Sequence, residues 1–195
     1  PVSDMPLATD AIRALAPWSP AYPGAARVDV AAPASGGTPL VHVGLRPDAT
    51  SEQVAALRER LGAWGHDHGV SVTARSPHER DTQLWAGTGH VQETLELPGA
   101  TDPEPLRWRV SPTGFWQIHR GAPQTLAGAV LRGAGLRPGD SVWDLYSGAG
   151  LFTAVAAREV GPTGSVFAVE GSPVTSADAA HNLAHAPHVT SVRGD

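Results

Sequence analysis

An acidic residue and two glycines lie close together in the second half of the chain. Asp144 precedes Gly148 by four residues, and Gly150 follows two residues later. Glycine has no side chain, so the backbone at these positions turns sharply and approaches a ligand closely. The residues before the glycines predict a strand, and those after them predict a helix whose unpaired N–H groups point at the same place. The sequence therefore predicts a ligand site at a strand-to-helix junction.

The residue types around these glycines favour S-adenosylmethionine (SAM) over a dinucleotide. A dinucleotide-binding loop needs a third glycine three residues after the second, and that position is Thr153. Asp144 would repel a pyrophosphate, but it suits a ligand that carries an ammonium and a sulfonium group. Glu170 ends the next expected strand, 20 residues after Gly150, where a carboxylate accepts both ribose hydroxyls. Asp195, at the end of the third expected strand, is placed to receive the adenine amino group.

Strands and helices alternate around this motif. The pattern predicts a helix from Pro123, then three strands at 141–146, 165–169 and 189–193. Helices are expected between them, at 151–159 and from Pro173 to about His185. Alternation with short links predicts an α/β fold with a parallel, doubly wound sheet.

The N-terminal part is predicted to be richer in β-structure. Period-two alternation predicts strands near 27–30, 40–43, 70–73, 84–85, 91–97 and 106–110. The turn 112–114 is expected to pair the last of these strands with 115–119 as a hairpin. We predict a β-rich α+β lobe over residues 1–112, followed by the first half of a Rossmann-like sheet over residues 113–195.

Two helices are expected in this lobe. The first is short and lies within Ala8 to Ala16. The second follows a capping box formed by Thr50 and Gln53, and Gly65 is expected to end it. Its apolar face is predicted to contain Val54, Leu57, Leu61 and Trp64.

Composition excludes several kinds of chemistry. The chain has 195 residues, no cysteine and no lysine, so it supplies no disulfide, iron–sulfur cluster, thiol nucleophile or Schiff base. Its histidine pairs are expected to be solvated, and we predict no metal site. The net charge is −5, so contacts with nucleic-acid phosphates are expected to use scattered arginines or to lie elsewhere. No membrane span or secretory signal is visible, and a cytoplasmic protein is expected.

Two segments, in order, resemble the SAM-dependent RNA 5-methyluridine methyltransferases of tRNA and ribosomal RNA. Segment 115–119, Phe-Trp-Gln-Ile-His, is similar to the family's Phe-x-Gln-Val-Asn. Segment 144–150, Asp-Leu-Tyr-Ser-Gly-Ala-Gly, is similar to its Asp-Leu-Tyr-Cys-Gly-x-Gly. Glu170, Asn182 and Asp195 follow at compatible positions. The resemblance covers about residues 80–195, and the glutamine motif separates this family from SAM enzymes in general.

The resemblance implies SAM as the cofactor and a tRNA or rRNA as the substrate of the full-length protein. It implies SAM contacts from Gln117, Tyr146 and Glu170, with Asp195 on the adenine side. The residues that would bind the cofactor are then Gln117, Asp144, Tyr146, Gly148, Gly150, Glu170 and Asp195.

The family's mechanism uses a cysteine thiolate that attacks C6 of uracil and a glutamate that removes the C5 proton. Both lie on later strands, so we expect no catalytic residue here, and we expect this chain, as a fragment, to be inactive. His119 and Leu151 depart from the family's asparagine and polar residue. Two alternatives stay open: a SAM enzyme acting on a small molecule or protein, and a non-catalytic domain with a vestigial SAM pocket.

Overall fold

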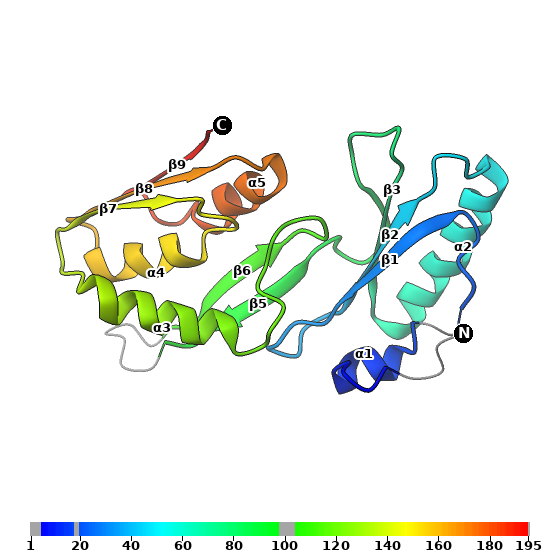
Figure 1. Cartoon of the computed structure of the whole chain (residues 1–195), viewed down its shortest axis with the longest axis horizontal. Helices are drawn as coiled ribbons and strands as arrows, with labels where there is room; N and C mark the ends of the chain where they lie inside the picture. The colour runs from blue at the N-terminus through cyan, green and yellow to red at the C-terminus, as the bar shows by residue number, and fades with distance from the viewer. Residues whose placement is uncertain (1–4, 18–19, 98–103, 195) are drawn as a thin grey trace. The chain divides into compact units, whose positions relative to one another are not determined.

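The chain forms two compact units, Pro1–Val91 and Gln92–Asp195. The structure, a computed structural model, describes residues 5–17, 20–97 and 104–194. Figure 1 follows the chain through both units, and each is described by itself. The division into domains at residues 112 and 113 stays a prediction.

The N-terminal unit is a four-stranded sheet with a long helix against it. Its strands lie in the order β1-β2-β3-β4, with β2 and β3 parallel and the outer pairs antiparallel. The crossover between the two parallel strands is the long helix α2, as a parallel pair requires. The bounds are α1 (Asp10–Leu15), β1 (Ala25–Ala31), β2 (Leu40–Leu45), α2 (Ser51–His68), β3 (Ser71–Arg75) and β4 (Gln83–Ala86).

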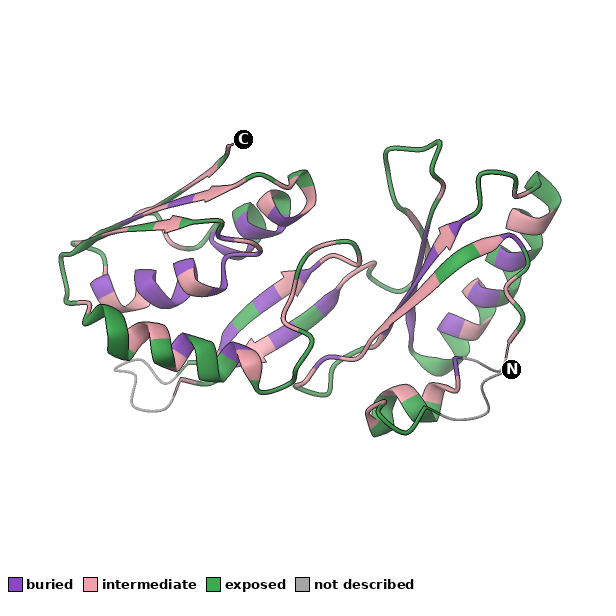
Figure 2. Ribbon diagram, viewed as in Figure 1, coloured by how far each residue is buried: buried purple, intermediate pink, exposed green. Residues whose placement is uncertain are grey.

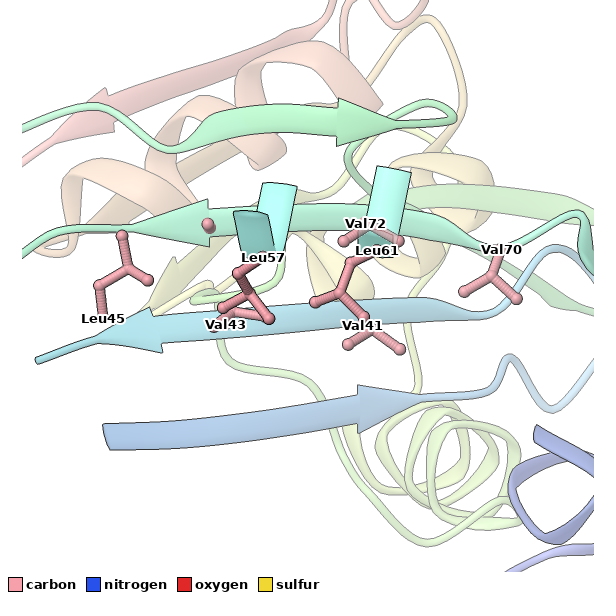
Figure 3. Packing of buried hydrophobic residues seen from close by; sticks show 8 residues of the cluster. Val41, Val43, Leu45, Leu57, Leu61, Val70 and Val72 are labelled. Carbon is pink, nitrogen blue, oxygen red and sulfur yellow. The ribbon is translucent and has the colours of Figure 1, made fainter. Parts of the chain in front are cut away.

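Helix α2 begins and packs as its sequence predicts. The Thr50 side chain accepts from the N–H of Gln53, and the Gln53 side chain accepts from the N–H of Thr50, so the capping box is confirmed. Leu57 and Leu61 are buried against the sheet, where Val41, Val43, Leu45, Val70, Val72 and Ala74 complete the core (Figure 3). Val54 and Trp64 lie at the margin of this core.

The predicted helix end at Gly65 is wrong. The helix continues to His68 and ends at Gly69, which has the left-handed φ of 62°. Gly65 serves close packing instead, since a Cβ there would lie 2.7 Å from Cγ2 of Val72 and 2.8 Å from the carbonyl of Val70. The absence of a side chain lets α2 approach β3.

The C-terminal unit confirms the predicted α/β class. β7, β8 and β9 form a parallel sheet in that order, with α4 and α5 as the crossovers. This is the arrangement of the first half of a Rossmann-like sheet. A separate pair of strands, β5 and β6, precedes it. The bounds are β5 (Val91–Leu95), β6 (Leu106–Val110), α3 (Ala122–Ala134), β7 (Ser141–Leu145), α4 (Leu151–Val160), β8 (Ser165–Glu170), α5 (Pro173–Asn182) and β9 (Val189–Arg193).

The predicted hairpin between 106–110 and 115–119 is wrong. β6 pairs with β5, and residues 115–118 have no regular structure. Side chains of α5 bind backbone groups of Arg109 and Ser111 that a following strand would have used. The strand partner that the alternation suggested is thus replaced by a helix distant in sequence.

Burial alternates from residue to residue along β7 and most of β8 (Figure 2), so the two faces of the parallel sheet differ. One face packs on α4, where Val142 and Val166 meet Ala156, Ala157 and Val160. The opposite face carries Trp143, which is 73% exposed, and Leu145, which is 58% exposed. Within the described residues, α4 therefore packs on one face of this sheet, and the other face carries the contact between Trp143 and Phe167.

Within the described residues, no helix has both the length and the apolar character needed to cross a membrane.

Candidate functional site

The loop between β7 and α4 has an unusual backbone. Tyr146, Gly148 and Gly150 all have positive φ, at 66°, 56° and 88°. For tyrosine this conformation costs about 1–2 kcal/mol, because its Cβ crowds the carbonyl oxygen. The Tyr146 side chain is 93% exposed, so packing of the ring does not offset that cost. Such strain is a feature of ligand-binding loops.

The two predicted glycines have different reasons to be glycine. A Cβ on Gly148 would meet no described atom within 4 Å, so its direction is open space at the end of the sheet. A Cβ on Gly150 would lie 3.1 Å from Cδ1 of Leu183, which follows α5. Gly148 therefore faces open space, and Gly150 lets the start of α4 pack against the end of α5.

Glu170 binds the loop directly. Its carboxylate accepts from the N–H of Gly148 at 2.8 Å and from the N–H of Ser172 at 2.7 Å. The structure thus joins two of the predicted site residues across neighbouring strand ends. Each carboxylate oxygen has a second lone pair, so the group retains acceptors for hydroxyls.

The pKa of the Glu170 carboxyl lies below its ordinary value. Partial burial acts to raise this pKa, but hydrogen bonds to the charged form, the largest from the N–H groups of Ser172 and Gly148, more than offset it. The carboxylate is therefore ionised at neutral pH, as an acceptor of hydroxyl donors should be.

Asp144 is half-buried and is held by α4. Its Oδ2 accepts from the hydroxyl of Thr153 at 2.5 Å. Burial raises the pKa of the Asp144 carboxyl, the Thr153 hydrogen bonds act against the rise, and the charge of Glu170 adds to it. Thr153 therefore orients this acid. In the sequence, Thr153 indicated only that the third glycine of a dinucleotide-binding loop is absent.

The segment that contains Gln117 begins against α5. Ser111 is bound through its N–H and its hydroxyl to Asp178, each at 2.8 Å. Gly114 also lies on α5, because a Cβ there would be 3.3 Å from Oδ2 of Asp178. Gln117 itself is half-buried in the irregular stretch that follows.

Sequence reasoning missed Asp178 and gave Asn182 no role. Both are buried on the same face of α5, four residues apart. An acid and an amide four residues apart lie on the same face of a helix. Their occurrence in an alanine-rich helix is the signal that could have identified them. Asp195 lies outside the described residues, and Leu151 is buried in the first turn of α4.

Among the described residues, no group of three or more histidine or acidic side chains is placed to hold a metal ion.

No family model matches the chain. Curated relatives do. The chain is 46% identical over 77 residues to an uncharacterized RNA methyltransferase of Streptomyces coelicolor, covering 40% of this chain and 17% of the relative. It is 37% identical over 149 residues to an uncharacterized RNA methyltransferase of Bifidobacterium longum, covering 66% and 33%. The 23S rRNA (uracil(1939)-C(5))-methyltransferase RlmD of Psychrobacter arcticus is 38% identical over 77 residues, covering 40% and 15%.

The predicted resemblance is therefore confirmed: the chain is related in sequence to proteins named as RNA methyltransferases. It spans 17% to 33% of the length of the first three of these relatives.

Several solved structures with similarity to this chain are named as methyltransferases. Pyrococcus horikoshii TYW2 in complex with MeSAdo is also similar, at 14% identity and a TM-score of 0.44, covering 88% of this chain and 56% of that one. A protein-L-isoaspartate O-methyltransferase is 32% identical with a TM-score of 0.35, covering 37% and 24%. With scores this low, the fold assignment rests on the strand order and crossovers described above.

Proposed function

We propose that the chain is the cofactor-binding front part of a SAM-dependent RNA methyltransferase. The observation that carries the proposal is the bond between Glu170 and the N–H of Gly148. It joins an ionised carboxylate to Gly148, and a Cβ added to Gly148 would meet no described atom within 4 Å. The relatives named as RNA methyltransferases support this class of reaction.

The residues present fit SAM. Glu170 would accept the ribose hydroxyls, and the open side of Gly148 would receive the ligand against the backbone. Asp144 would face the positively charged methionine part, with Gln117 and Tyr146 as further contacts. When bound, SAM supplies an electrophilic methyl group. The described side chains would orient it, with Glu170 at the ribose and Asp144 near its positive charge. Asp195 would contact the adenine.

We further propose uracil C5 as the methylated atom and a tRNA or rRNA as the substrate. This finer assignment is supported by the relative named as a uracil C5 methyltransferase and by the Phe-Trp-Gln segment at 115–117. Uracil C5 is a poor nucleophile until a group adds to C6. The 195 residues include no cysteine to add there, so we expect them alone to methylate nothing.

The test is transfer of labelled methyl from SAM to unmodified tRNA and rRNA by the full-length protein, followed by nucleoside analysis. We expect label in 5-methyluridine, and loss of it in a Glu170→Gln variant. Label in protein or a small molecule instead would support the alternative substrates. Absence of SAM binding would support a vestigial pocket. Methylation by residues 1–195 alone, at the rate of the full-length protein, would refute the assignment of catalysis to residues outside them.

A further inference from the structure

The buried face of α5 is polar. Thr175, Asp178 and Asn182 are 3%, 0% and 6% exposed, and they lie on one face at helical spacing. A helix that only packs normally buries apolar side chains on such a face. Polar groups are buried at a cost unless they are hydrogen-bonded, so the partners of Asp178 and Asn182 show what the face does.

Asn182 binds the edge of β6 as a neighbouring strand would. Its Oδ1 accepts from the N–H of Arg109 at 2.8 Å, and its Nδ2 donates to the carbonyl of Arg109 at 3.0 Å. The same Nδ2 donates to the carbonyl of Ala149 at 3.0 Å. Ala149 lies between the two glycines of the β7–α4 loop. One amide therefore ties β6 to the glycine loop.

Asp178 binds the residue that follows β6. Its Oδ2 accepts from the N–H of Ser111 at 2.8 Å, and its Oδ1 accepts from the Ser111 hydroxyl at 2.8 Å. Arg109 adds an ion pair, with its Nε 3.3 Å from Oδ1 of Asp178. The chain leaves Ser111 toward Gln117, so Asp178 fixes the starting point of the glutamine segment.

We propose that Asp178 and Asn182 are positioning residues for the cofactor pocket. Together they hold the glycine loop and the start of the glutamine segment at a fixed separation, so that both contact one ligand. This inference rests on the proposed function for the identity of the ligand, SAM. The separation itself follows from the six contacts that the two side chains make with Arg109, Ser111 and Ala149, and these contacts do not depend on the ligand.

The sharpest variant is Asn182→Asp. Aspartate keeps the acceptor for the N–H of Arg109 and has nearly the same shape. It replaces the donor with an oxygen that faces the carbonyls of Arg109 and Ala149, so the link to the glycine loop is lost without creating a cavity. Asp178→Asn is the complementary variant, because an amide replaces one acceptor oxygen with an NH2 donor, which then faces either the N–H of Ser111 or the Nε–H of Arg109. His181→Ala, at an exposed position of the same helix, is the matched control.

The experiment measures SAM affinity by calorimetry and hydrogen exchange by mass spectrometry in the full-length protein and these three variants. We expect Asn182→Asp and Asp178→Asn to bind SAM at least about tenfold more weakly, the effect of losing one or two net hydrogen bonds. We expect faster exchange in segments 109–119 and 146–151, with the control unchanged. Exchange in α3 and β8, which belong to the same unit but lie outside these segments, reports whether the C-terminal unit of a variant has simply unfolded.

The outcomes separate the two proposals. If the wild-type protein binds SAM and both variants bind it equally well, the positioning role is wrong and the proposed function stands. If the wild-type protein binds no SAM, the proposed function is wrong, and the exchange rates alone decide the positioning role. Unchanged exchange in both segments would then overturn it.

Discussion

Helices α2 and α5 both bury one face, and the two faces have opposite character. α2 buries Leu57 and Leu61 in the main apolar core of the N-terminal unit. α5 buries Asp178 and Asn182 against the backbone of β6 and the glycine loop. The first helix stabilises its unit by removing apolar surface from water. The second uses its buried face to fix the position of two loops, which is what a ligand site requires.

The largest expected effect is on the apolar face. Leu61→Asn removes a buried leucine and leaves an amide without a partner, so we expect a loss of about 3–5 kcal/mol in the free energy of unfolding. Urea-induced unfolding followed by circular dichroism measures it. Arg58→Asn, on the exposed side of α2, is the control. A loss below about 1 kcal/mol would show that this face is not the core.

The reverse exchange probes the polar face. Asn182→Leu adds apolar area, but it orphans the N–H of Arg109 and the carbonyls of Arg109 and Ala149. We expect a net loss of about 2–3 kcal/mol, because unsatisfied buried polar groups cost more than the added area contributes. The same unfolding measurement applies, with His181→Leu as the exposed control. A variant as stable as wild type would mean that α5 merely packs.

Gly65→Ala tests how closely α2 approaches β3. A Cβ there would lie within 3 Å of atoms of Val72, Val70 and Ala86. We expect a loss of about 1–3 kcal/mol from this overpacking, although alanine is the better helix former. Gly133→Ala is the matched control in α3, since its Cβ would meet no described atom within 4 Å. There we expect a gain of up to about 1 kcal/mol. Equal effects at both positions would contradict the packing explanation.

The smallest effect concerns Asp144. Its folded-state pKa is raised above 3.8, so the stability that it contributes is present below that value and is lost as pH rises through the folded pKa. Asn does not titrate, and we expect Asp144→Asn to become more stable relative to wild type from about pH 4 to about pH 7. Thermal unfolding across this range measures the difference. A difference that is constant or shrinks with pH would show that burial does not control this group.

Local signals predicted local structure well. The capping box at Thr50 and Gln53 involves residues three apart, and the structure contains it. The site residues Asp144, Gly148 and Glu170 could be placed from sequence because parallel strands bring their carboxyl ends to one edge. The contacts of these residues with a cofactor stay a prediction.

What the sequence did not predict depends on partners far away in the chain. The need for glycine at position 65 comes from its close contact with Val72 across the core, which no local pattern reveals. Residues 115–119 alternate like a strand, but Asn182, 73 residues after Arg109, already binds the edge of β6. Tertiary contacts of this kind override local propensity.

Calorimetry of SAM with the wild-type protein and a Gly148→Val variant tests the central claim most directly. The open space beside Gly148 is where the ligand is proposed to lie, so a valine side chain would fill it. We expect saturable binding by the wild-type protein and none detectable in the variant, with unfolding curves showing that both are folded and Gly133→Ala binding like wild type. Unchanged SAM affinity in Gly148→Val would contradict the account by removing the glycine loop from the site.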